Sequence, residues 1–133
     1  MNQLKGKIEA INSHDELLLI ELNVLETKIK AILIGKPYDY SYLKIGNEIA
    51  ILFKETDVII SNDKNMNISI QNKLTCTIKS ITKGKLLSQV NLNFNGLTLS
   101  SITPTTSVIK LNLNNQDTVT ALLKSNEIIL SEC

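Results

Sequence analysis

The sequence predicts an all-β chain of two tandem five-stranded barrels, each with a short helix. The first observation behind this prediction is an internal repeat, because residues 70 positions apart match from one end of the chain to the other without a gap. Most matched positions are aliphatic, as in Leu4 with Leu74, and a fixed period of this kind indicates a duplicated fold unit. We therefore expect a first unit at residues 1–62, a linker at 63–68 and a second unit at 69–133.

The second observation is an alternation of apolar and polar residues along short segments. In residues 4–10 the apolar side chains occupy every second position, which is the pattern of a strand with one buried face. Strands of the first unit are expected at 4–10, 20–24, 29–34, 49–53 and 58–60. The alternation lapses over residues 37–43, where a short helix or turn ending before Gly46 is predicted.

The second unit repeats this plan, with strands expected at 74–81, 90–94, 97–103, 119–123 and 128–130. Asn95 and Gly96, between two of these strands, indicate a tight hairpin. The polar run at 62–67 has no periodicity and falls where the linker is expected. Five short strands and a helical insert in a unit of about 60 residues fit a partly open, OB-like barrel.

Composition excludes several classes of function. The net charge is +1, from 14 basic and 13 acidic residues spread along the chain, so we expect no nucleic-acid partner and no membrane partner. The single histidine, His14, and two distant cysteines argue against a metal site. No nucleophile with a paired base and no Gly-rich phosphate loop occurs, so no enzyme is expected. The N-terminus has no signal-peptide pattern, which predicts a cytoplasmic protein.

Two small barrels with many aliphatic and few aromatic residues are expected to bury apolar surface against each other and between protomers. We therefore expect a homo-oligomer, either a dimer, a trimer or a hexamer. Tyr38, Tyr40 and Tyr42 have no aromatic counterparts in the second unit, and packing or a subunit contact is the favoured explanation. Cys76, which matches Gly6 in the repeat, is expected to be a small buried core residue.

Two matched pairs are polar, and they are the first candidates for function. Asn2 matches Asn72, and Lys54 matches Lys124. An asparagine at the start of a strand can bind a ligand or cap the backbone. A lysine at a strand end can bind an anion or protect an edge against aggregation. The pattern alone leaves these alternatives open.

The order of short motifs in the first unit resembles a known family. The motifs are Asn-Gln-Leu-x-Gly from Asn2, Gly-Asn-x-Ile from Gly46 and Leu-x-Lys from Leu52. This order resembles the molybdate-binding Mop repeat, a TOBE-type domain. Two such repeats in tandem resemble the molbindins and the C-terminal region of the molybdate-responsive repressor. The resemblance implies OB-like barrels that bind molybdate or tungstate without catalysis, for storage, buffering or homeostasis, at sites between subunits.

The resemblance also implies which residues hold the oxyanion. The family uses a Ser-Ala-Arg-Asn segment before the first strand, a Thr-x-x-Ser segment after the third and a Lys-Ala or Lys-Ser pair after the fourth. The matching residues of the second unit are Ser69, Gln71, Asn72, Ser107, Lys124 and Ser125. Gln71 stands where the family has arginine, and Pro104 stands where it has threonine.

The first unit matches this pattern less well. Asn2 and Lys54 remain, but the chain begins too late to supply the serine and arginine, and Ile34 and Pro37 replace the threonine and serine. Lys54 is followed by Glu55. A carboxylate close to a bound anion opposes its binding, so we expect the first-unit site to be weak or lost.

Molybdate and tungstate are tetrahedral dianions that offer only oxygen acceptors, so hydroxyl, amide and ammonium donors suit them. Selection against sulfate would come from pocket size, since the charge is the same. The alternative hypothesis is a degenerate Mop tandem, an oligomerisation or regulatory module with little anion affinity, to which Gln71, Pro104 and Glu55 point. An OB-type nucleic-acid binder is disfavoured by 4% aromatic content and the absence of tryptophan.

Overall fold

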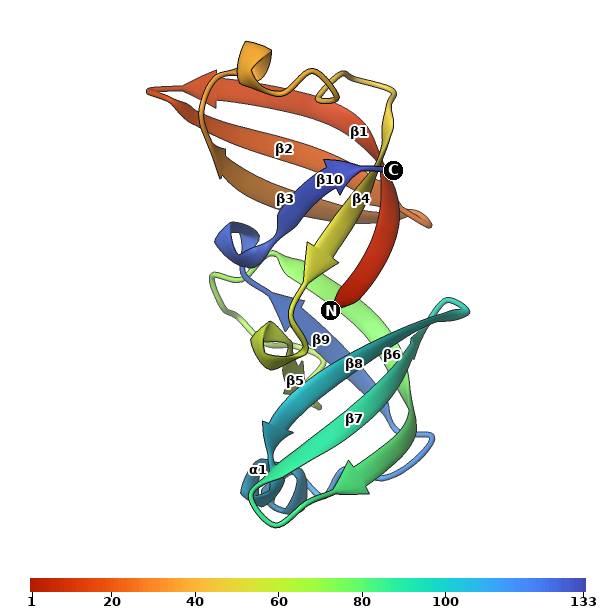
Figure 1. Cartoon of the computed structure of the whole chain (residues 1–133). Coiled ribbons are helices and arrows are strands. Elements are labelled where there is room, and N and C mark those ends of the chain that lie inside the picture. The colour runs from red at the N-terminus through yellow and green to blue at the C-terminus, as the bar shows by residue number, and fades with distance from the viewer.

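The computed structural model describes residues 1–133 and shows two β lobes stacked along one axis (Figure 1). The first unit contains β1 (Asn2–His14), β2 (Leu17–Val24), β3 (Thr27–Ile34), the 3₁₀ turn η1 (Pro37–Asp39), β4 (Glu48–Phe53), the 3₁₀ turn η2 (Glu55–Asp57) and β5 (Ile59–Ser61). The second contains β6 (Asn72–Lys83), β7 (Leu87–Phe94), β8 (Leu97–Pro104), helix α1 (Thr105–Lys110), β9 (Thr118–Leu123), the 3₁₀ turn η3 (Ser125–Glu127) and β10 (Ile129–Glu132). No helix has the length and apolar character needed to cross a membrane.

Strand pairing reproduces the sequence repeat residue by residue. Gly6 of β1 lies opposite Ile49 of β4, and Cys76 of β6 lies opposite Val119 of β9, 70 positions further on. The long first strand of each unit also has a register shift at the same place. The predicted all-β fold of two five-stranded units is therefore confirmed.

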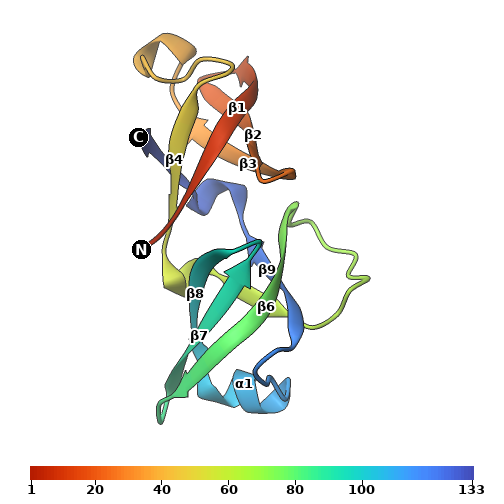
Figure 2. The same cartoon turned by 90° about the vertical axis from the view of Figure 1, so that its right-hand side faces the viewer.

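The last strand of each unit lies in the sheet of the other unit. The two sheets have the orders β10-β4-β1-β2-β3 and β5-β9-β6-β7-β8. Ile59 of β5 lies opposite Leu122, and Ile129 of β10 lies opposite Leu52, so the exchange is reciprocal. Figures 1 and 2 show β10, in blue, running beside the yellow β4 of the first unit. The sequence pattern finds all ten strands but does not reveal this exchange.

Asn2 and Asn72 join the two units through paired hydrogen bonds. The Nδ2 atom of Asn72 donates to the carbonyl of Lys30 at 2.9 Å, and its Oδ1 atom accepts from the Lys30 N–H at 2.7 Å. Asn2 makes the same pair with Ser100, at 2.8 Å for each bond. Both side chains are buried, with Asn2 7% exposed and Asn72 1% exposed. Each amide thus holds an edge strand of the other unit, β3 or β8.

The two barrels share one hydrophobic core of 27 buried residues, which is continuous between them. Their interiors differ at one matched position. A Cβ atom on Gly6 would lie 2.8 Å from the Cδ1 atom of Ile51, so no larger residue fits there without movement. Ile51 corresponds to Ala121 in the second unit, and this smaller residue leaves room for the Cys76 side chain, which is 2% exposed. The prediction that Cys76 is a small core residue is confirmed.

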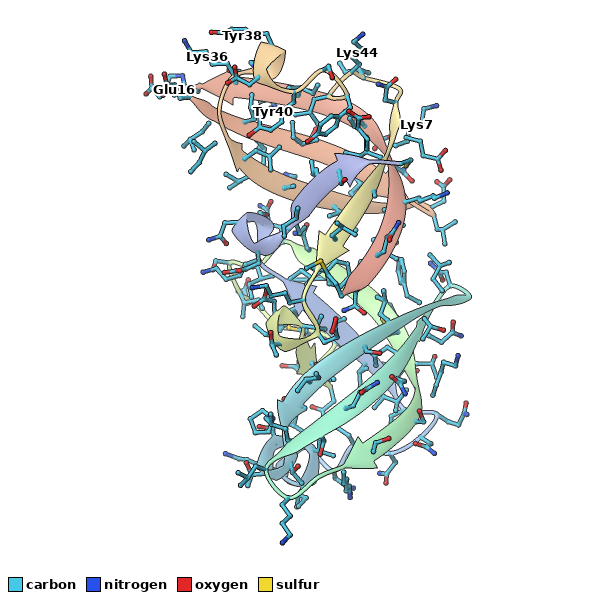
Figure 3. All side chains as sticks on the ribbon, viewed as in Figure 1. Lys7, Glu16, Lys36, Tyr38, Tyr40 and Lys44 are labelled. Carbon is cyan, nitrogen blue, oxygen red and sulfur yellow. The ribbon has the colours of Figure 1, made fainter.

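Tyr38 and Tyr40 lie at one end of the first lobe (Figure 3), and Tyr40 and Tyr42 pack against the core. The rings of Tyr40 and Tyr42 meet edge to face, with centroids 6.0 Å apart, and the Tyr40 hydroxyl donates to the Ile34 carbonyl at 2.6 Å. Tyr38 is 77% exposed, with the Lys36 ammonium 5.8 Å from its ring centroid. Packing therefore accounts for Tyr40 and Tyr42, while Tyr38 lies on the surface.

We predict that Asn72→Ala and Asn2→Ala each lower the free energy of unfolding by about 1–3 kcal/mol, because each removes the partner of two backbone groups at the contact between units. Urea unfolding followed by circular dichroism measures the loss. Asn67→Ala is the matched control, since Asn67 is exposed and should leave the transition unchanged. Unfolding midpoints equal to that of the wild type would contradict the structural role.

We predict that the Cys76 thiol is inert in the native protein. Burial raises the pKa of this thiol to about 11, so at pH 8 about one molecule in a thousand carries the reactive thiolate. Cys133 is exposed and provides an internal comparison. Ellman's reagent at pH 8 should titrate one thiol per chain in buffer and two in denaturant. Rapid reaction of both thiols in buffer would show that the core around Cys76 opens readily.

Candidate functional site

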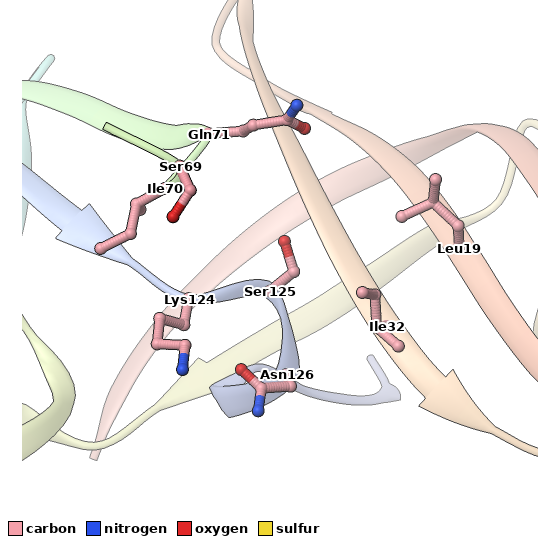
Figure 4. Close-up of a pocket in the computed structure, with 8 residues that line it drawn as sticks. All are labelled: Leu19, Ile32, Ser69, Ile70, Gln71, Lys124, Ser125 and Asn126. Carbon is pink, nitrogen blue, oxygen red and sulfur yellow. The ribbon is translucent and has the colours of Figure 1, made fainter. Parts of the chain in front are cut away.

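A hollow of about 370 Å³ opens on the surface where the two units meet (Figure 4). Its lining residues are Leu19, Ile32, Ser69, Ile70, Gln71, Lys124, Ser125 and Asn126. They come from β2 and β3 of the first unit, from the segment that precedes β6, and from the start of η3. We call this hollow the interunit pocket.

Strand pairing explains how distant parts of the chain meet here. Asn72, the first residue of β6, lies opposite Leu123, the last residue of β9. The residues just outside this pair therefore leave the sheet at the same end, which brings Gln71 close to Lys124. From there the chain continues through η3 into β10, which joins the first sheet, and η3 consequently lies against β3.

The polar side of the pocket presents hydrogen-bond donors. Ser69 and Ser125 contribute hydroxyls that point into the space between the two segments in Figure 4. Gln71 and Asn126 contribute amides, and Lys124 contributes the one charged group. The structure gives none of these five side chains a hydrogen bond or an ion pair within the chain. No carboxylate lines the pocket, so the donors and the positive charge remain available to an anion.

Four residues implicated by the sequence lie together in this pocket, namely Ser69, Gln71, Lys124 and Ser125. Asn72 is adjacent to them in sequence, but both polar atoms of its amide bind Lys30. The structure thus assigns Asn72 a bonded role in the wall behind the pocket.

The other implicated residues lie elsewhere. Ser107 is on α1 and lines a different hollow, which also contains Thr56 and Pro104. Asn2 binds the backbone of Ser100. Lys54 precedes η2, at the position in the first unit that corresponds to Lys124. The single chain therefore does not bring Ser107, Asn2 or Lys54 to the interunit pocket.

Sequence reasoning missed the apolar wall and one amide. Asn126 follows Lys124 and Ser125 directly, and this adjacency was a usable signal. Leu19 and Ile32 belong to the other unit and have side chains that are not fully buried. Nothing in a strand pattern indicates that an outward-facing residue meets a segment about 90 to 105 positions away.

The first unit has a different arrangement at the corresponding place. Glu55 occupies the position of Ser125, and its Oε1 atom lies 2.6 Å from the ammonium of Met1. The hydrogen bond from this ammonium lowers the pKa of the Glu55 carboxyl below its ordinary value. The group that follows Lys54 is therefore a carboxylate, an acceptor where the second unit has a hydroxyl donor.

The chain is similar to known molybdate-binding proteins and to one domain family. Residues 68–130 match the model of the TOBE domain. The whole chain is similar in structure to the cytoplasmic molybdate-binding protein ModG, solved with molybdate bound, with a TM-score of 0.93 and 23% identity over 99% of this chain and 96% of ModG. A molybdate-binding protein from Sporomusa ovata is 38% identical over 45% of this chain and 90% of its own, with a TM-score of 0.44.

No curated protein matches the chain. The family match covers the second unit, including Ser69, Gln71, Lys124 and Ser125 of the interunit pocket. The similarity to ModG extends over both units and shows a common tandem fold. The second unit is similar to the TOBE domain, and the chain as a whole has the tandem OB-like fold of ModG.

Proposed function

We propose that this chain binds molybdate or tungstate, without catalysis, in the interunit pocket. The proposal rests on the five donor side chains that line this pocket. None of them makes a hydrogen bond or an ion pair within the chain, and no carboxylate lines the pocket. A tetrahedral dianion offers oxygen acceptors in four directions and no donors, so hydroxyls, amides and one ammonium complement it. Lys124 supplies the positive charge.

The replacement of arginine by Gln71 determines how the charge is balanced. Glutamine donates hydrogen bonds without a positive charge, so Lys124 is the one cation among the lining residues. Hydrogen bonds to charged groups contribute about 1.5–3 kcal/mol each, roughly twice the contribution of neutral pairs. We therefore expect binding to depend more on Lys124 than on any single neutral donor.

Molybdate as the ligand is supported by ModG, which shares the fold and was solved with molybdate bound. ModG is cytoplasmic, and we assign this chain to the same compartment, with a role in storing or buffering the anion. Four of the implicated residues line one pocket, which favours a working site over a degenerate module with little affinity.

A homo-oligomer with sites completed between protomers is part of the proposal. The strand that forms the apolar wall, β3, is an edge strand, and its side chains Ile32 and Ile34 are exposed beside the pocket. Leu17 of β2 is exposed on the same part of the sheet and lies opposite Ile34. A second copy covering this apolar rim would also remove the bound anion from water, which strengthens its interaction with the donors.

Titration calorimetry of the dialysed protein tests the function. We expect molybdate to release or absorb heat in a saturable way and to raise the melting temperature, while sulfate at the same concentration does neither. Lys124→Ala should weaken the affinity about 10- to 100-fold, as the loss of a charged hydrogen bond predicts. Lys54→Ala is the matched control, because Lys54 has the same place in the repeat and lies outside the pocket.

Two results would count against the proposal. Absence of heat and of any thermal shift at millimolar molybdate, with folded protein, would contradict anion binding itself. Equal losses of affinity in Lys54→Ala and Lys124→Ala would contradict the interunit pocket as the site.

A further inference from the structure

The two units carry net charges of opposite sign. Residues 1–62 contain seven lysines and nine acidic residues, which gives −2, whereas residues 69–133 contain six lysines and three acidic residues, which gives +3. The linker between them has one residue of each sign, so the near-neutral total conceals this difference. Because the two lobes are stacked along one axis, one half of the molecule is negative and the other half is positive (Figure 1).

The far end of the first lobe is both apolar and acidic. We call it the acidic end, and it consists of Asp15, Glu16, Leu17, Ile34, Tyr38 and Asp39. Leu17 lies opposite Ile34 across β2 and β3, and the N–H of Gly35 donates to the carbonyl of Glu16 at 2.7 Å. These contacts place η1, which follows Gly35 closely, beside the turn between β1 and β2. Figure 3 shows Glu16 and Tyr38 at this end.

The far end of the second lobe is built from the corresponding segments and is basic. We call it the basic end, and it consists of Lys83, Lys85, Leu86, Leu87, Ile109 and Lys110. The carbonyl of Leu86 accepts from the N–H of Thr105, the first residue of α1, at 2.9 Å. The turn between β6 and β7 therefore lies against the helix that carries Ile109 and Lys110. Figure 1 shows α1 and the first-unit loop that contains η1 at opposite ends of the molecule.

The repeat shows that charge has changed sign between the two ends. Asp15 corresponds to Lys85, while Leu17 corresponds to Leu87. The acidic end has three carboxylates, with Lys36 as the one nearby lysine in these segments. The basic end has three lysines, and no acidic residue occurs between positions 63 and 117 of the chain. None of these three lysines makes an ion pair or a hydrogen bond within the chain, so their charge is available to a partner.

Both ends also expose large apolar side chains. Ile34 and Tyr38 are 79% and 77% exposed at the acidic end, and Leu86 and Ile109 are 82% and 62% exposed at the basic end. Clustered apolar side chains inside a charged rim are typical of protein–protein interfaces. Because the ends have opposite charge, each complements the other and repels a second copy of itself.

We infer that the acidic end of one protomer docks on the basic end of another, so that copies of this chain associate head to tail. Two different surfaces meet in such a contact, which therefore closes into a ring or repeats as a chain. The contact would cover Leu17 and Ile34, which also border the interunit pocket. The inference specifies the contact in the homo-oligomer of the proposed function, on which it rests to that extent, and it requires no bound anion.

Reversing the charge of each end tests the inference. Asp15→Lys with Glu16→Lys makes both ends basic, and Lys83→Glu with Lys85→Glu makes both ends acidic. Each double variant alone should be monomeric by size-exclusion chromatography with light scattering at micromolar concentration. An equimolar mixture of the two should recover the mass of the wild-type assembly, because each end again meets an end of opposite charge. A variant that had merely lost its fold would not recover in this way.

A matched control separates the acidic end from the net charge of the chain. Glu9→Lys with Glu26→Lys changes the charge of the first unit by the same amount as the acidic-end variant. Glu26 lies in the turn between β2 and β3, at the other end of these strands. This control should keep the wild-type mass. Circular dichroism establishes that each variant is folded.

The outcomes separate the inference from the proposed function. Double variants that keep the wild-type mass, or a mixture that stays monomeric, would overturn the head-to-tail contact. A monomeric wild type would also overturn it, and binding of that monomer to phosphatidylserine vesicles would assign the basic end to a membrane surface instead. Recovery of the assembly in the mixture, together with no molybdate binding by the wild type, would support the contact and count against the proposed function alone.

Discussion

The interunit pocket exists because the last strand of each unit crosses to the other unit's sheet. The pairing of β10 with β4 holds the turn η3, which directly precedes β10, against β3. The crossing brings Lys124 and Ser125 to a wall formed by Leu19 and Ile32, residues about 90 to 105 positions earlier in the chain. Backbone hydrogen bonds along the exchanged strands fix this arrangement, so the site depends on the fold of both units together.

The buried asparagines complete this frame at the edge strands. An exposed edge strand presents unpaired backbone groups, and a side-chain amide can satisfy one N–H and one carbonyl at once. Asn72 does so at Lys30, two residues before Ile32 in β3. The two polar matches of the repeat therefore have different physical explanations: the asparagines hold the units together, while Lys124 faces an open pocket.

This separation shows what a single sequence can reveal. The 70-residue register and all ten strands follow from the spacing of aliphatic residues, and the motif order led to four of the eight pocket residues. The exchange could not be predicted, because Ile59 and Ile129 occupy equivalent positions and either strand fits either sheet. Ser107 matched a motif but lies on α1, away from the pocket, since spacing along the chain does not determine which turns meet across two units.

Duplication gave this chain two copies of one backbone, and the copies have diverged where side chains meet. In the core one change compensates for another. The first unit has Gly6 beside the large Ile51, and the second unit has the larger Cys76 together with the smaller Ala121. At the turns after β4 and β9 the change is local, because Glu55 and Ser125 are both partly exposed and the charge of Glu55 is met by the Met1 ammonium. Loop positions of this kind can change without repacking the core, so they can alter what the site binds.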